Sequence, residues 1–183
     1  MKITKFENID GPLLITPNLY MDSRGFFLER YKDQYAIDSN ISVKFIQDNF
    51  SRSNPGVLRG LHYQFDFPQG KLITVLSGKI LDISVDLRTK TDSLGKTIAV
   101  ELNGDNPQWL WLPAGFAHGF CVLGDKTADV LYKVDNQYSP KGESGIIYND
   151  PLLNIKWPIN NPTLNSKDLS LPTFEDYLKS PHF

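Results

Sequence analysis

The sequence predicts an all-β protein, a jelly-roll barrel with short peripheral helices, on three observations. Short runs rich in Val, Ile, Phe, Tyr and Trp recur along the chain, with few helical patterns between them. The 12 prolines and 13 glycines separate these runs, in turn sequences such as SNPG, DFPQG and NGDNP. The length of 183 residues suits one domain. We therefore expect a single domain over residues 1–183, with an N-terminal strand arm and a C-terminal arm.

One segment shows the strand pattern most clearly. Residues 79–88, KILDISVDLR, alternate apolar and polar side chains, which gives the strand two different faces. On the polar face we expect Asp86 to be solvated. For Asp82 two positions are possible, in solvent or behind a functional residue that it would support. The other expected strands are residues 43–50, 57–65, 71–78, 97–103, 108–113, 118–124 and 127–134.

Two short helices are expected at the periphery of the fold. Residues 31–37 and 172–180 carry weak helical patterns. Thr173 can cap the second helix, because acidic residues follow it in the first turn. The polar stretch from Asn160 onward is expected to form the C-terminal arm rather than a linker to another domain.

Composition argues against several classes of partner. The 19 basic and 21 acidic residues give a formal charge of −2, which provides no general attraction for nucleic acid or an anionic membrane. Cys121 is the only cysteine, so no internal disulfide can form, and we expect it to be buried. No segment approaches the roughly 18 apolar residues of a membrane span, and no signal sequence is visible. We expect a cytoplasmic protein without nucleic-acid or membrane partners.

A histidine motif raises the question of a metal. Residues 112–120, LPAGFAHGF, contain a P-x-G-x-x-H spacing that ends at His118. This spacing resembles the second conserved motif of the cupin superfamily, whose small jelly-roll barrels often bind a metal. At the place of the first motif, residues 62–64 read HYQ, so the second histidine of the usual His-x-His pair is missing. Two histidines are fewer than the three or four ligands of a first-row metal, and we predict no metal site.

Several ionisable side chains lie in or beside apolar runs that we expect to be inside. They include Arg59 and His62 on one expected strand, Lys71 at the start of the next, and Tyr132. A barrel lined by His, Lys, Arg and Tyr holds a base, an oxyanion partner, anion binders and a phenolic acid. This set suits proton transfer next to a carbonyl in a negatively charged substrate. A lone strand histidine is more often a hydrogen-bonded core residue, so the assignment depends on these neighbours.

A series of strings from about Asp22 to Asp168 resembles the dTDP-4-dehydrorhamnose 3,5-epimerase family, in the family's order. The resemblance implies a metal-free cupin-type barrel that needs no cofactor. It implies epimerisation at C3 and C5 of dTDP-4-dehydro-6-deoxy-D-glucose to dTDP-4-dehydro-L-rhamnose, the precursor of dTDP-L-rhamnose for polysaccharide. The strings are DSRGFFLERY, FIQDN, GVLRGLHYQ, QGKL, DISVDLR, LWLPAGFAHGF, LYKV, YSP, NDPLLNIKWP and SKD.

The resemblance also implies roles for individual residues. His62 matches the family's base, and Asp168 would orient its ring. Lys71 would stabilise negative charge on O4 of the sugar, and Tyr132 matches the acid that protonates the opposite face. Among the substrate contacts, the arginines would bind the diphosphate and the tyrosine would stack on the thymine. These substrate contacts are Arg24, Glu29, Gln47, Asn49, Arg59, His118, Tyr138, Glu143 and Lys167.

The resemblance further implies a homodimer. The N-terminal segment 1–30 holds aromatic residues beside Arg24 and Glu29, which suits a strand that pairs with a partner chain. Within the chain, Arg59 and His62 have opposite parity and would face opposite sides of a regular strand. A β-bulge at Gly60 would bring both side chains to one site, and we favour that arrangement.

Three other functions remain open at this point. The chain could epimerise only C3 or only C5 of a related nucleotide 4-keto sugar, because the same base and acid serve either outcome. It could be a sugar-nucleotide binding cupin without catalysis, although His62 and Tyr132 are both present. A metal-dependent cupin oxygenase or isomerase is disfavoured by the missing ligands.

Overall fold

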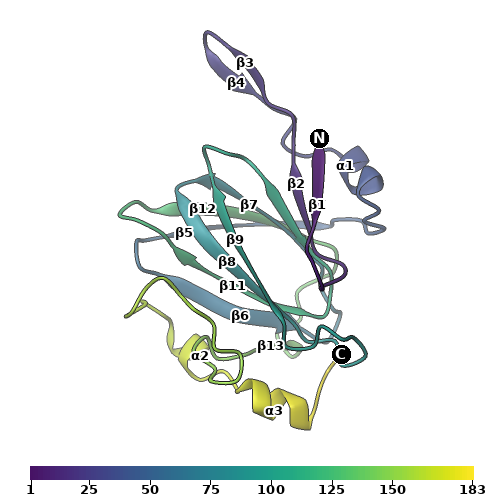
Figure 1. The fold of residues 1–183 in the computed structure, drawn as a ribbon, viewed down its shortest axis with the longest axis vertical. Coiled ribbons are helices and arrows are strands. Elements are labelled where there is room, and N and C mark those ends of the chain that lie inside the picture. Colours follow the sequence, from purple (N-terminus) through teal and green to yellow (C-terminus); the bar gives the residue numbers. More distant parts are fainter.

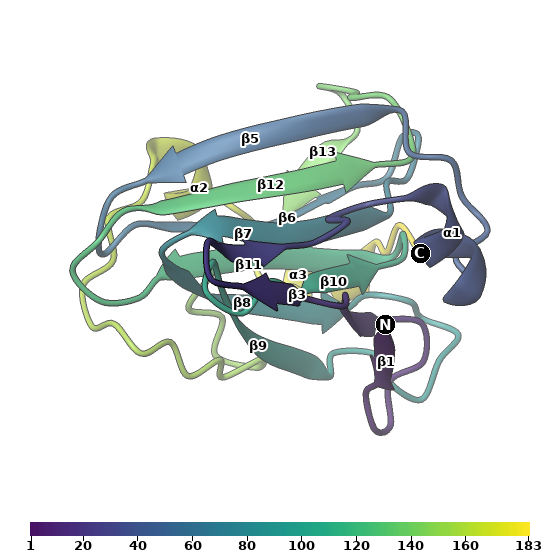
Figure 2. The ribbon, with the colours of Figure 1, turned by 90° about the horizontal axis from the view of Figure 1, so that it is seen from above.

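Two antiparallel sheets lie face to face and form the barrel in the computed structural model, which describes residues 1–183 (Figures 1 and 2). The six-stranded sheet has, in spatial order, β1 (Lys2–Lys5), β2 (Leu13–Thr16), β10 (Trp109–Leu112), β7 (Lys71–Ser77), β12 (Ala128–Val134) and β5 (Gln47–Ser53). The five-stranded sheet has β13 (Glu143–Gly145), β6 (Leu58–Gln64), β11 (Phe116–Val122), β8 (Lys79–Asp86) and β9 (Thr97–Asn103).

The predicted all-β fold with short peripheral helices is confirmed. The eight expected strands correspond to β5 through β12, with ends shifted by a few residues. Both expected helices form, as α1 (Asp33–Asp38) and α3 (Phe174–Lys179), and the Thr173 side chain caps α3 by accepting from the Asp176 amide. The short elements β1, β2, β13 and α2 (Ser166–Leu169) lack a distinct sequence pattern. None of the helices is long and apolar enough to span a membrane.

The space between the sheets is apolar over one part of its length. Ile73 and Val75 of β7 pack there with Phe116 and Phe120 of β11, in a cluster of 14 buried residues that both sheets supply. The polar side chains of the same inner faces, such as His62 and His118, lie beyond this cluster. Burial of the apolar cluster holds the two sheets together and leaves a polar cavity in the rest of the barrel.

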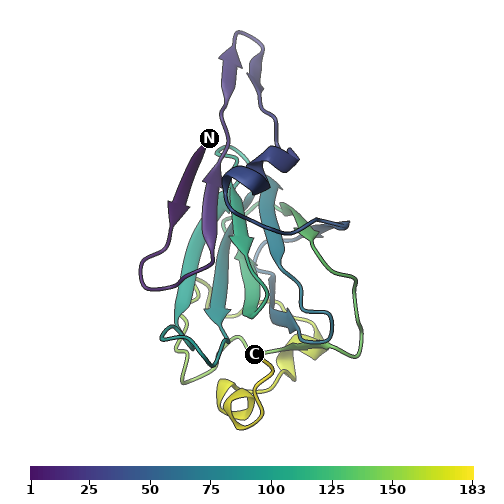
Figure 3. The same ribbon diagram turned by 90° about the vertical axis from the view of Figure 1, so that its right-hand side faces the viewer.

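In β8 the apolar face is turned away from the barrel interior and the polar face toward it, whereas a strand of a barrel more simply has its apolar face inside. Its apolar residues Ile83 and Val85 lie on the outer face, where Phe174 and Tyr177 of the C-terminal arm cover them. The arm passes below the five-stranded sheet, with α2 and α3 along its outer side (Figures 1 and 3). The polar face of β8 is therefore turned toward the interior of the barrel, and Asp82 is fully buried.

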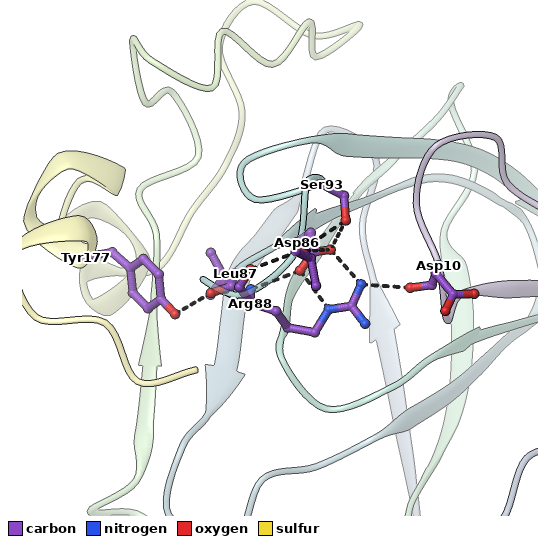
Figure 4. Close-up of polar contacts among 7 residues, drawn as sticks. Asp10, Asp86, Leu87, Arg88, Ser93 and Tyr177 are labelled. Atoms are coloured by element: carbon purple, nitrogen blue, oxygen red, sulfur yellow. Dashed lines mark hydrogen bonds and ion pairs between the residues drawn. The ribbon is translucent and has the colours of Figure 1, made fainter.

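The expectation that Asp86 is solvated is wrong. Its carboxylate is fully buried and accepts from the Arg88 guanidinium at 2.6 and 2.9 Å, and from the Ser93 hydroxyl at 2.6 Å (Figure 4). Arg88 also donates to the Asp10 carbonyl at 2.7 Å, and the Tyr177 hydroxyl donates to the Leu87 carbonyl. The segment after β8 folds back over the carboxylate, a long-range feature that alternation alone does not reveal.

Two further segments extend or cover the six-stranded sheet. On its outer face, Trp109 and Trp111 pack with Ala36 of α1 and with Ile41 in a second apolar cluster. The hairpin of β3 (Tyr20–Asp22) and β4 (Gly25–Phe27) projects away from the barrel (Figures 1 and 3). Its large apolar side chains are exposed, and they are Tyr20, Met21, Phe26 and Phe27.

A buried carboxylate anchors the C-terminal arm, and its loss provides a test of the fold. Asp150 is buried and accepts from the amides of Leu152, Leu153 and Phe174 at 2.8 to 3.0 Å. Because hydrogen bonds to a charged acceptor contribute about 1.5–3 kcal/mol, we expect Asp150→Ala to lower the free energy of unfolding by about 3 kcal/mol. Urea unfolding measures this, with Asp105→Ala, at an exposed carboxylate, as the control. Equal small losses in both variants would contradict the anchoring role.

Candidate active site

Two adjoining cavities occupy the polar part of the barrel. One has a volume of about 320 Å³ and the other about 240 Å³. Both are lined by His62, Lys71, Tyr132 and Glu143, so they meet at these four side chains. A larger cavity of about 650 Å³ lies elsewhere, between the N-terminal loop and the segment after β8, and none of the predicted site residues lines it. Three of the four residues predicted to be catalytic are therefore shared by the two smaller cavities.

His62 is held by a carboxylate from the C-terminal arm. The Nε2 atom lies 2.7 Å from Asp168 Oδ1, and the other oxygen of Asp168 accepts from the Gly60 amide at 3.0 Å. Asp168 sits in α2, whose N-cap Asn165 accepts from the Asp168 amide. Burial works to raise the pKa of Asp168, but the hydrogen bonds from His62 and Gly60 outweigh it and hold the pKa below its usual range. An ionised Asp168 requires hydrogen on Nε2, which leaves Nδ1 free to take a proton.

A register shift at Gly60 brings Arg59 and His62 to one site, as predicted. His62 pairs with His118 and Arg59 pairs with Phe120, so two residues of β6 oppose one residue of β11. Gly60 has φ +110°, and a Cβ there would lie 2.7 Å from the Gly119 Cα, so only glycine fits. Both Arg59 and His62 line the smaller cavity. The Arg59 Nε donates to Ser53 Oγ at 2.9 Å, which fixes the direction of the guanidinium.

Lys71 is a partly buried residue whose ammonium group lies between the two sheets and lines both cavities. Its Nζ lies 3.5 Å from the His62 carbonyl oxygen. Burial lowers the pKa of Lys71 to about 8, against the opposing charges of Asp82 and Glu143. The group is therefore still largely protonated at neutral pH, so it can donate a hydrogen bond to an oxyanion in the cavities.

Tyr132 faces the cavities from the opposite sheet to His62. It lies on β12, where its neighbours in register are Asn49 of β5 and Ile73 of β7. Burial raises the pKa of Tyr132, Glu143 raises it further, and the positive charge of Arg59 opposes the rise. The phenol therefore keeps its proton at neutral pH and can donate it, which suits a general acid.

A second histidine–carboxylate pair lies beside the first. His118 of β11 pairs in register with His62, and its Nε2 lies 2.7 Å from Asp82 Oδ2. The sequence left two positions possible for Asp82, in solvent or behind a site residue. Asp82 is fully buried and contacts His118 from behind, so it occupies the second position. Each imidazole thus has its own carboxylate, and no three His, Cys, Asp or Glu side chains gather as a group of metal ligands.

A small polar network borders the cavity of about 320 Å³. Glu143 Oε2 accepts from the Lys167 ammonium at 2.6 Å and from the Tyr138 hydroxyl at 2.7 Å. Burial works to raise the pKa of Glu143, but these two hydrogen bonds outweigh it and keep the pKa below its usual range. Tyr138 is about half exposed, with its ring open to a ligand. Gln47 and Asn49 line the same cavity and are joined by a 2.8 Å hydrogen bond.

Three of the predicted substrate-contact residues line neither cavity, although one of them, Lys167, is paired with the lining residue Glu143. The other two are Arg24 and Glu29. Arg24 is in the projecting β3–β4 hairpin and pairs with Asp22 at 2.6 Å. Glu29 follows the hairpin and pairs with Lys32 at 2.6 Å. Neither side chain lines the cavities, so one chain alone does not bring them to His62.

Several lining residues were not selected from the sequence. Gln64 lies two residues after His62 and Ser51 two residues after Asn49, so period-two alternation along β6 and β5 could have identified both. Asn165 precedes the SKD string in the position of a helix cap, which is a weaker signal. Gln69 donates to the Asn136 carbonyl and has no local sequence signal.

The arrangement supports proton transfer across a small polar cavity. An oriented imidazole base on one sheet and a protonated phenol on the other border the same space, with a lysine ammonium between them. A substrate carbon placed there can lose a proton to one face and gain one on the other. An oxyanion formed in between would be stabilised by Lys71.

Comparison with known proteins agrees with this geometry. The family model described as dTDP-4-dehydrorhamnose 3,5-epimerase matches residues 7–176. The dTDP-4-dehydrorhamnose 3,5-epimerase of Shigella flexneri is 43% identical over 96% of this chain and 97% of its own length. A crystal structure of the dTDP-6-deoxy-D-glucose-3,5-epimerase of Legionella pneumophila, in complex with dTDP-4-keto-L-rhamnose, has a TM-score of 0.89 and 43% identity, over 94% of this chain and 92% of that one.

A further crystal structure, the dTDP-4-dehydrorhamnose 3,5-epimerase of Bacillus anthracis with TDP and PPi bound, has a TM-score of 0.90 and 40% identity. It covers 94% of this chain and 98% of that one. The matches therefore extend over nearly the whole chain, and they include the strands and the α2 helix that carry His62, Tyr132 and Asp168. This chain belongs to the dTDP-4-dehydrorhamnose 3,5-epimerase family.

Proposed function

We propose that this chain epimerises C3 and C5 of dTDP-4-dehydro-6-deoxy-D-glucose and produces dTDP-4-dehydro-L-rhamnose. The family membership supports this reaction, and so does the placement of a base and an acid on opposing sheets around one cavity. The observation that carries the proposal is the 2.7 Å contact between His62 Nε2 and a buried Asp168, which directs the other ring nitrogen to act as a base.

Each inversion needs one proton removed and one returned. The C4 ketone acidifies the hydrogens at C3 and C5, because the electron pair left on carbon delocalises to O4 as an enolate. His62 Nδ1 takes the proton from one face, and the Tyr132 hydroxyl delivers a proton to the other face. Lys71 donates a hydrogen bond to O4 as negative charge collects there. No net electron transfer occurs, so the chemistry needs no redox cofactor.

The remaining lining residues suit the sugar and the nucleotide. Arg59 supplies a guanidinium fork for a diphosphate, and Lys167, which is paired with the lining residue Glu143, supplies a second positive charge. Tyr138 presents an exposed ring on which thymine can stack. The Ser51 hydroxyl is buried without a hydrogen-bond partner in the protein, and a sugar hydroxyl would satisfy it. Other proposed substrate contacts are Gln47, Asn49, His118 and Glu143.

We further propose a homodimer in which the β3–β4 hairpin of one chain reaches the cavity of the other. The hairpin exposes an aromatic surface that would be buried against a partner. It also carries Arg24, which lies outside the cavities of its own chain, and Glu29 follows directly after it. A two-fold arrangement would exchange two such hairpins and bring both side chains to the partner's site. We also place the single domain in the cytoplasm, since Cys121 is a free, buried thiol that suits a reducing compartment.

The reaction is tested by incubating the protein with dTDP-4-dehydro-6-deoxy-D-glucose in D₂O. Because protons returned to carbon come from groups that exchange with solvent, we expect deuterium at both C3 and C5 of a product with rhamno configuration. Nuclear magnetic resonance of the sugar locates the label. Deuterium at a single carbon would show a monoepimerase, and no deuterium would exclude this substrate. The Tyr132→Phe variant is the matched control, because it keeps the base and should lose inversion of configuration.

The hairpin exchange is tested by mixing two defective variants. Arg24→Ala and His62→Ala chains should each be impaired, but a mixed dimer has one site with an intact arm and an intact base. If variants exchange at random, activity should return to about a quarter of the wild-type value. Mixing Arg24→Ala chains with Arg24→Ala/His62→Ala double-variant chains is the control and should give no gain. An unchanged average in the first mixture would show that Arg24 serves its own chain or none.

A further inference from the structure

Asp82 is a buried carboxylate to which the reaction scheme assigns no role. It lies on β8 with no exposed surface, and its Oδ2 contacts His118 Nε2 at 2.7 Å. The only other polar side chain bound to it is Ser84, whose hydroxyl donates over a long 3.4 Å. A buried carboxylate that lacks an arginine or lysine in hydrogen-bond contact is costly, so a functional reason for its position is expected.

Asp82 interacts with a residue on each of the two sheets, His118 by direct contact and Lys71 through its charge. On β11, His118 stands between Ser84 of β8 and His62 of β6 in register, so β11 separates the strand of Asp82 from the strand of His62. Lys71 begins β7 in the opposing sheet and lines the same small cavity as His118. The charge of Asp82 reaches Lys71 across the barrel and favours its protonated form, against the burial that lowers the pKa of Lys71 to about 8.

We propose that Asp82 is a positioning residue, which fixes the tautomer of His118 and keeps Lys71 as an ammonium ion when the enolate forms. This inference rests on the oxyanion role proposed for Lys71. With Nε2 bound to Asp82, His118 presents Nδ1 as an acceptor for a sugar hydroxyl. The same negative charge balances Lys71, so one carboxylate outside contact with the substrate maintains two groups that would touch it.

Other charged or titratable groups surround Lys71, and any test must separate them from Asp82. Glu143 also favours the protonated lysine, whereas Arg59 is a positive charge on the same cavity. Asp135 binds the amide of the residue before Lys71. The charged or titratable residues that line the cavities with Lys71 are Arg59, His62 and Tyr63 from β6, His118 from β11, Tyr132 from β12, Tyr138, Glu143 from β13, and Asp168 from α2.

The direct test is the titration of Lys71 with and without the Asp82 charge. The protein is labelled with [ε-¹³C]lysine, and the Lys71 signal is assigned from its absence in Lys71→Arg. In the wild type the signal should titrate with a midpoint of about 8. In Asp82→Asn, which keeps the shape but removes the charge, the midpoint should fall by roughly one pH unit. A midpoint that stays at about 8 would overturn the proposal.

Asp86→Asn is the matched control. Asp86 is a fully buried carboxylate on the same strand, but its charge is paired with Arg88 (Figure 4). Its removal should leave the Lys71 midpoint unchanged, and an equal shift in this variant would show a general effect of disturbing β8. If Asp82→Asn does not fold, the smaller Asp82→Ser serves in its place, and thermal unfolding is recorded for each variant. Asp82→Glu restores the charge and should restore the midpoint.

The rate of epimerisation gives a second readout. Because Lys71 is protonated below its pKa, a lower pKa removes the oxyanion partner at a lower pH. The deficit in kcat of Asp82→Asn should therefore grow as pH rises from 6.5 to 8.5, with KM for the nucleotide sugar changing less. A deficit that is constant with pH would contradict the effect on Lys71. The lysine titration does not require turnover, so it distinguishes failure of this inference from failure of the proposed reaction.

Discussion

The hydrogen bond between His62 and Asp168 is the contact on which the rest of the site depends. It joins two residues 106 positions apart, one on a central strand and the other in the C-terminal arm. The same carboxylate accepts from the Gly60 amide, so the bulge that aligns Arg59 and the ring that we propose as the base share one anchor. The arm is in turn fixed by Asp150, which binds the first turn of α3, and by the apolar cover over the five-stranded sheet. The site therefore forms only when the arm is docked on the barrel.

The interior of the barrel has an apolar part, which stabilises the fold, and a polar part, which holds the candidate active site. The apolar cluster at one part of the lumen stabilises the two sheets, and two other clusters lie on their outer faces. Because both faces of the five-stranded sheet are covered, its inner face can carry polar groups without loss of the core. Burial of these groups shifts their pKa values, because it lowers the pKa of Lys71 and raises the pKa of Tyr132. Both shifts suit the roles that we propose for these two residues.

The sequence predicts the parts of this structure that depend on local pattern. Alternation located β5 to β12, and the opposite parity of Arg59 and His62 with a glycine between them predicted the bulge. The error at Asp86 has a different origin, because only the fold shows that Arg88 and Ser93 close over it. Alternation identifies two faces of a strand but not which of them is inside. Arg24 and Glu29 were selected by resemblance, and one chain cannot place them at the site.

We propose that Asp168 acts through His62, and a double-mutant cycle measures this dependence. Solvent exchange of substrate hydrogens is measured for His62→Ala, Asp168→Ala and the double variant, together with the affinity for dTDP. If Asp168 acts through His62, His62→Ala should lower the exchange rate by at least about 10²-fold and adding Asp168→Ala should lower it no further, with dTDP affinity largely retained. Losses that multiply in the double variant, or an equal loss of dTDP affinity, would contradict it.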